Sequence, residues 1–174
     1  MRRQGSHRYL RSVHLVERDR GDPTPAVEAP TEEGPALRDA IAATERAAAD
    51  ETEAGTTRVR LATYGLPAID ADAAIGPHLV PDERVHSLRA RAILSVPGGD
   101  QALGYGGTLY LTSRRLVHLG QVVVNVQLTD IEETSLAGEL LLLSLREGEG
   151  ISLNLDRPRV LRAEIAEATR GMRQ

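Results

Sequence analysis

The stretch YGGTLYLTSRRLVHLG, residues 105–120, contains one strand, a short polar break and a second strand. Leu109 and Leu111 occupy alternate positions on one face of the first strand, and residues 112–115 are polar and compact enough for a reversal. An apolar run resumes over 116–119. Period-two patterning on both sides of a polar break is typical of a β-hairpin. We therefore expect a small antiparallel β-domain to be built around this segment.

Short apolar runs on both sides of the hairpin extend the same pattern. They predict further strands over 85–96, 122–128, 131–136, 140–145 and 151–155. Glycine-rich and acidic turns separate them, among them Pro97-Gly98-Gly99-Asp100. The run at 140–145 has little alternation, so we expect burial on both of its faces or a place beside the closing helix.

The chain after residue 155 has the pattern of an amphipathic helix. Asp156 suits the N-cap and Pro158 the first turn, while Leu161 and Ile165 lie one helical turn apart. Gly171 suits the end of the helix. The predicted fold is mainly β: a bent antiparallel sheet or barrel of six to seven strands capped by a C-terminal α-helix.

The first part of the chain differs in composition from the rest. Prolines and acidic residues dominate 21–35, and alanines dominate 36–50. We predict a largely disordered arm over 1–55 with a short helix at 36–50, a connector over 56–78 with a strand at 57–64, and a compact domain over 79–174. The helix is either transient, because its apolar face is thin, or a docking element for a partner.

Composition excludes several classes of function. All 21 basic residues are Arg and there is no Cys, so lysine-based phosphate loops, Schiff bases, thiol nucleophiles and thiolate metal sites are excluded. The arginine bias suggests a high-G+C bacterial genome. The formal net charge of −4 disfavours nucleic-acid binding. The apolar runs are too short for a membrane span or a signal peptide, so we expect a cytoplasmic protein.

No arrangement of polar residues predicts catalysis or a cofactor. The five histidines lack zinc-ligand spacing, and His118 is expected to be a partly buried, hydrogen-bonded side chain. The pair Gly106-Gly107 lacks a phosphate-loop motif, so we interpret it as turn or bulge glycines. We therefore expect no enzyme, no metal and no cofactor.

Three segments carry a resemblance to a known family. They are LVPDERV at 79–85, GTLYLTSRRLVH at 107–118 and LTDIEE at 128–133. The region 79–174 resembles the bacterial PH-like and GRAM-like domains of the PH superfold. That resemblance implies a non-catalytic binding or scaffolding module, because this superfold serves lipids, peptides and protein partners.

Four arginines form the candidate binding patch: Arg89, Arg91, Arg114 and Arg115. The resemblance would place lipid-binding basic residues in the loop at 96–104, but this loop has none and contains Asp100. The leading hypothesis is therefore docking of a protein or peptide, at a sheet edge or in the groove beside the helix. Peripheral binding to anionic lipid at the inner face of the membrane is one alternative, and a small-ligand-binding barrel is another.

Overall fold

The computed structural model describes residues 33–96, 104–147 and 150–172, and the predictions for 1–32 and for the turn at 97–100 lie outside this part. The strands are β1 (Val85–Ser95), β2 (Tyr105–Thr112), β3 (Arg115–Gly120), β4 (Val123–Gln127), β5 (Ile131–Ala137), β6 (Leu140–Leu145) and β7 (Ile151–Asn154). The helices are α1 (Glu33–Tyr64) and α2 (Pro158–Gly171), with single 3-10 turns η1 (Gly76–His78) and η2 (Leu128–Asp130).

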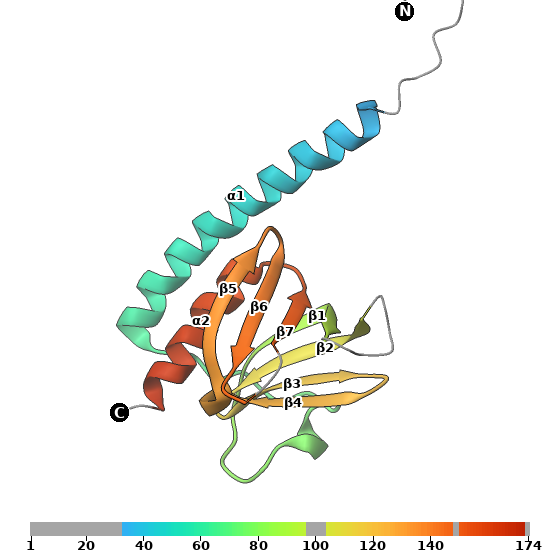
Figure 1. Ribbon diagram of the computed structural model, residues 1–174. Coiled ribbons are helices and arrows are strands. Elements are labelled where there is room, and N and C mark those ends of the chain that lie inside the picture. The colour runs from blue at the N-terminus through green and yellow to red at the C-terminus, as the bar shows by residue number, and fades with distance from the viewer. Residues whose placement is uncertain (1–32, 97–103, 148–149, 173–174) are drawn as a thin grey trace, which may run out of the picture.

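The strands form one antiparallel sheet in the order β4-β3-β2-β1-β7-β6-β5. Strand β1 holds the two halves together, because Leu94 pairs with Tyr105 of β2 on one side and with Leu153 of β7 on the other. The sheet bends at β1 so that β2–β4 lie across from β5–β7 (Figure 1). Strands β4 and β5 do not pair, so the sheet remains open. The prediction of a bent antiparallel sheet with a closing C-terminal helix is confirmed.

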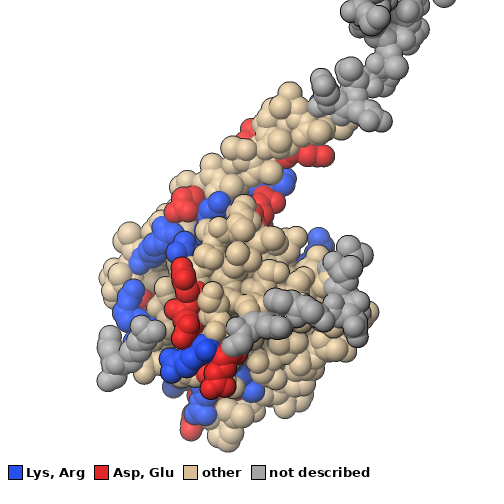
Figure 2. Space-filling view, in the orientation of Figure 1, with Lys and Arg blue, Asp and Glu red and all other residues tan. Residues whose placement is uncertain are grey.

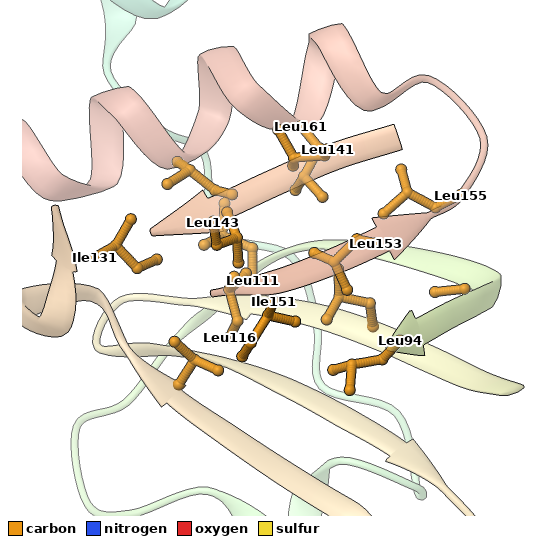
Figure 3. Packing of buried hydrophobic residues seen from close by; sticks show 14 of the residues in the cluster. Leu94, Leu111, Leu116, Ile131, Leu141, Leu143, Ile151, Leu153, Leu155 and Leu161 are labelled. Carbon is orange, nitrogen blue, oxygen red and sulfur yellow. The ribbon is translucent and has the colours of Figure 1, made fainter. Parts of the chain in front are cut away.

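Aliphatic side chains from both halves of the bent sheet fill its interior (Figure 3). Leu111 and Leu116 come from the first half, and Leu141 and Leu143 from the second. Leu161 of α2 packs into the same cluster, which buries the apolar stripe of the helix. Of the two alternatives expected for β6, burial on both faces is wrong, because Leu141 and Leu143 are buried but Leu140 is 36% exposed. The other alternative is confirmed, since β6 lies beside α2.

Helix α1 corrects two predictions made for the first part of the chain. It is a single helix of 32 residues, and it includes the segment 57–64 that was predicted to be a strand. The alternation of Val59, Leu61 and Thr63 suggested a strand, but burial follows helical spacing: Thr57 and Leu61 are buried and Val59 is 69% exposed. The helix ends before Gly65, which has a φ of +71°. Its backbone amide donates a hydrogen bond to the Leu61 carbonyl, and both features are typical of a helix C-terminus.

The prediction that Asp156 caps the N-terminus of α2 is wrong. Arg157 occupies the N-cap position with a φ of +57° and gives no side-chain cap, and the Asp156 side chain is 83% exposed. The cap comes from α1 instead. The Asp50 carboxylate accepts hydrogen bonds from the backbone amides of Arg159 at 2.9 Å and Val160 at 3.3 Å. Asp50 therefore satisfies two otherwise unpaired amides of the first turn.

Gly106 and Gly107 were predicted to be turn or bulge glycines. They lie in β2 and not in a turn, and Gly107 pairs with Ala92, where the irregularity of β1 ends. Gly107 lies within the strand and pairs with Gly120 of β3. A Cβ atom at Gly107 would lie 2.3 Å from the Leu119 carbonyl oxygen and 2.8 Å from the His118 ring. The glycine is required because the backbone of β3 and the buried imidazole approach it closely.

Candidate functional site

An open groove lies between α1, β1 and the start of α2. It consists of two adjoining pockets of about 430 and 620 Å³. Five lining residues belong to both pockets: Glu53, Ala90, Arg91, Asp156 and Arg157. We call this feature the bulge groove. One end lies at Arg46 and Glu139, and the other at Arg60 and Glu164.

An irregularity in β1 shapes the floor of the bulge groove. The pairing with β2 runs from Arg89 opposite Leu109 to Ala92 opposite Gly107, so β1 contains one extra residue there. Arg91 lies in this bulge with a φ of +58°. A non-glycine residue with positive φ is uncommon, and such residues concentrate at turns and binding sites. The bulge re-aims the side chains of the strand toward α1.

The acidic side chains of the groove already have arginine partners. Glu53 lies 2.6 Å from Arg157, Glu139 lies 3.3 Å from Arg46, and Glu164 lies 2.9 Å from Arg89. Asp50 lies 3.5 Å from Arg159, and Asp156 lies 3.7 Å from Arg157. Each carboxylate thus lies within 4 Å of an arginine, with Glu53 and Asp156 sharing Arg157.

Two arginines of the groove lack such partners. Within the described residues, Arg60 of α1 and Arg91 of the bulge make no ion pair or side-chain hydrogen bond, and both are exposed. Leu88 lies in the same part of the groove and is 41% exposed. The groove therefore offers two unpaired guanidinium groups and one exposed apolar side chain.

The structure separates the four arginines predicted to form a patch. Arg89 and Arg91 both line the bulge groove, but the Arg89 side chain is 16% exposed and pairs with Glu164. Arg115 lies at the start of β3 and pairs with Glu83. Arg114 is in the turn between β2 and β3. The preceding Ser113 links this turn to Arg84: its amide donates to the Arg84 carbonyl at 2.8 Å, and its Oγ accepts from the Arg84 amide at 3.1 Å. The structure thus places only Arg89 and Arg91 in one pocket.

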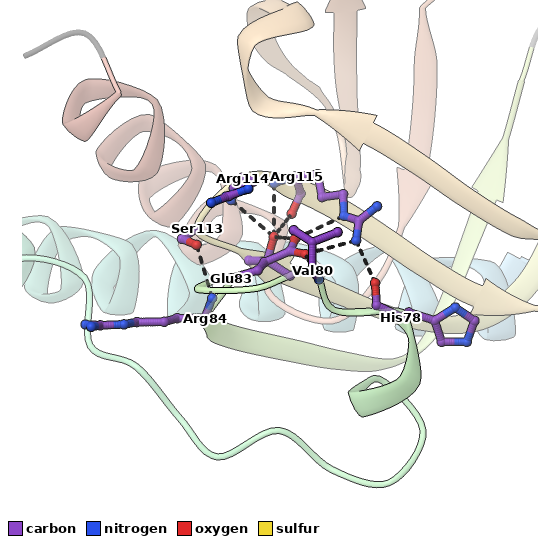
Figure 4. A network of polar contacts seen from close by, with 8 residues as sticks. His78, Val80, Glu83, Arg84, Ser113, Arg114 and Arg115 are labelled. Carbon is purple, nitrogen blue, oxygen red and sulfur yellow. Dashed lines mark hydrogen bonds and ion pairs between the residues drawn. The ribbon is translucent and has the colours of Figure 1, made fainter.

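Arg115 belongs to a buried polar network (Figure 4). Its Nε and Nη2 donate to the two carboxylate oxygens of Glu83 at 3.0 and 2.9 Å, and Nη2 also donates to the His78 carbonyl at 2.7 Å. The Thr112 hydroxyl donates to Glu83 at 2.6 Å, and so does the Val80 amide at 3.0 Å. Burial alone would raise the pKa of Glu83, but these hydrogen bonds outweigh burial and lower it. Arg115 fixes the connector to the hairpin.

A second polar contact anchors the connector on the outer face of the sheet. The Tyr110 hydroxyl donates to Asp72 at 2.9 Å, and the amides of Ile75 and Ala74 donate to the same carboxyl group. Burial and the neighbouring carboxylate raise the pKa of Tyr110 to about 12. The Ile75 amide and the Tyr110 hydroxyl lower the pKa of Asp72. Ile75 is fully buried against Tyr110 and Val117, so the connector is part of the packed structure.

The interior of the sheet does not resemble a ligand-binding barrel. The gap among Leu94, Leu109, His118 and their neighbours is too small for a water molecule. His118 is fully buried, more than predicted, and its Nε2 lies 3.3 Å from the Ala92 carbonyl oxygen. In the residues that the structure describes, no group of three His, Asp or Glu side chains could hold a metal ion, and no helix could span a membrane.

Charges of both signs are interspersed where α1 passes over the domain (Figure 2).

The sequence interpretation did not identify the contribution of α1 to the bulge groove. The segment 57–64 was interpreted as a strand, so Arg60 was not considered beside β1. The signal was present in Ala54, Thr57 and Leu61, whose spacing of three and four residues is that of a helix face.

No protein-family model matches the chain, and no curated protein matches it. Among solved structures, it is similar to one described as the Vps36 N-terminal PH domain, at 16% sequence identity and a TM-score of 0.48. The match covers 61% of this chain and 93% of that chain. The described residues themselves form a seven-stranded antiparallel sheet followed by a C-terminal helix.

Proposed function

We propose that this chain is a non-catalytic PH-like binding module that docks a protein or peptide partner in the bulge groove. The observation that carries the proposal is an open groove whose carboxylates are paired while Arg60 and Arg91 are not. Paired carboxylates are poor proton acceptors, whereas unpaired guanidinium groups beside an exposed leucine suit recognition of another chain. The finer assignment to bacterial GRAM-like domains is part of this proposal and rests on the sequence resemblance.

Site-specific photo-crosslinking in the cells that produce the protein tests the docking surface. A photoreactive residue replaces Ala90 in the groove, and a matched variant carries it at the exposed Ala73 of the connector. We expect one discrete adduct from position 90 that is absent from position 73. The protein recovered in that adduct should bind the purified chain, and the Arg60→Gln/Arg91→Gln variant should bind it more weakly. Identical adducts from both positions, or none from position 90, would contradict the proposal.

Binding to anionic lipid is a second candidate, supported by a different observation. Arg84 and Arg114 are adjacent at one end of the β1–β2 pair, are exposed, and have no side-chain partner in the described structure. Flotation with phosphatidylserine vesicles tests it, using the Arg84→Gln/Arg114→Gln variant. Equal flotation of wild type and variant would exclude this pair as the lipid site.

A further inference from the structure

We infer that the bulge groove binds an acidic peptide segment in an extended conformation, with an apolar residue seated on Leu88 between carboxylates that pair with Arg60 and Arg91. This inference rests on the proposed function and adds the chemical class of the partner.

The charge balance inside the groove points to an acidic ligand. The five carboxylates that line it each lie within 4 Å of an arginine, at 2.6 to 3.7 Å. Arg60 and Arg91 have no such partner among the described residues. The two pockets are lined by six arginines and five carboxylates, so the guanidinium groups are in excess. An acidic segment needs only the two guanidinium groups that are unused, so charge complementarity favours it.

The backbone at Arg91 supports a binding role for its side chain. A φ of +58° would be relieved by glycine, yet the position holds a long cation directed from a strand bulge into the groove. The neighbouring Arg89 shows the contrast, because its guanidinium is largely buried and is held by Glu164. The bulge thus places Arg89 in a structural ion pair and leaves Arg91 exposed in the groove.

The size of the groove distinguishes a peptide from a small anion. The helix face that lines it extends from Arg46 to Arg60, which corresponds to about 21 Å at the rise of an α-helix. An extended chain of about six residues has that length. Leu88, 41% exposed beside the buried Val160, offers an apolar contact that inorganic phosphate or a lipid headgroup would not use.

Fluorescence anisotropy with the full-length chain tests the inference. The probe is a labelled glutamate-rich peptide with one central leucine, and its control is the same peptide with glutamine in place of glutamate. We expect the glutamate peptide to bind and the glutamine peptide to bind far more weakly. The Arg60→Gln/Arg91→Gln variant should weaken binding about tenfold, since two partly exposed ion pairs are lost. The matched Arg84→Gln/Arg114→Gln variant should bind like wild type.

Loss of folding is separated from loss of contact by the Arg91→Gly variant. Glycine adopts the positive φ without strain, so this variant should melt at or above the wild-type temperature while binding the peptide more weakly. Three results would overturn the inference: no binding of the glutamate peptide, equal weakening in the Arg84→Gln/Arg114→Gln variant, or full displacement of the peptide by millimolar phosphate or by phosphatidylserine vesicles. If the peptide fails while the crosslink at position 90 persists, the acidic class is wrong and the docking function stands.

Discussion

Replacing Arg115 by methionine tests whether this arginine is structural. The side chain makes three hydrogen bonds, two to Glu83 and one to the His78 carbonyl. Arg115 and Glu83 are 15% and 0% exposed, so the substitution leaves a buried carboxylate with only Thr112 and Val80 as donors. Breaking a buried ion pair costs about 3–5 kcal/mol. Because the Arg115 side chain is 15% exposed and thus partly solvated, we expect a loss near the lower limit, about 3 kcal/mol in the free energy of unfolding.

The assay is urea denaturation at pH 7, followed by circular dichroism. Arg114→Met is the matched control, because this neighbour has no side-chain partner in the part of the chain that the structure describes. The control should change stability by less than about 0.5 kcal/mol. If Arg115→Met costs no more than Arg114→Met, the network does not hold the connector, and Arg115 is a solvated side chain available for binding.

The same variant has a defined pH dependence. The folded state lowers the pKa of Glu83, so the unfolded chain takes up this proton first as pH falls. Stability from the ionised pair is complete above the ordinary glutamate pKa of about 4.3 and is lost as pH decreases below it. The difference between wild type and Arg115→Met should therefore shrink below about pH 4. A difference that stays constant to pH 3 would refute an ionic origin.

Three further predictions concern separate contacts. Asp50→Ala should cost about 1–2 kcal/mol in urea denaturation by removing the cap of α2, whereas Asp156→Ala should be nearly neutral; equal costs would contradict the cap assignment. Gly107→Ala should lower the melting temperature much more than Gly106→Ala. A Cβ at Gly107 would lie 2.3 Å from a backbone oxygen, whereas one at Gly106 meets nothing within 4 Å. Similar melting temperatures of the two variants would refute the close approach of β3 to Gly107. In an ultraviolet titration of the wild type, one tyrosine should ionise near pH 12, and this step should be absent from Tyr110→Phe. The stability that Tyr110 contributes should be lost as pH rises above 10. Ionisation of all tyrosines near pH 10 would contradict the contact with Asp72.

The sheet was predictable because its patterns are local. Short aliphatic runs separated by polar breaks located the strands of the sheet, and the apolar stripe of α2 located the closing helix. The hairpin at 105–120 was accurate because a reversal needs only residues that are adjacent in sequence. The fold class followed from the number and sequence of these elements, whereas the order of the strands in the sheet was not predicted.

The groove was not predictable, because its parts come from distant segments. Ala54, Thr57 and Leu61 are weak signals, since small and β-branched residues bury little apolar area and the neighbouring Val59 suggests a strand. The cap of α2 was assigned to the adjacent Asp156, although a carboxylate from another helix occupies the site. The sequence identified the arginines but not their partners, so Arg115 and Arg91 looked equivalent. In the structure Arg115 belongs to a buried polar network, whereas Arg91 is exposed.

The cap of α2 also constrains the kinetics of folding. Asp50 and the amides that it caps are separated by 109 and 110 positions, so the contact closes one of the longest loops in the chain. Closing a loop of this length costs conformational entropy before its contacts form, which favours late docking of α1 onto an assembled sheet. We expect Asp50→Ala to accelerate unfolding while leaving the refolding rate almost unchanged, as is typical of contacts absent from the transition state. The amides at the start of α2 should then exchange hydrogen faster than those of β2 and β3, which makes the junction of the two helices the first part of the domain to open.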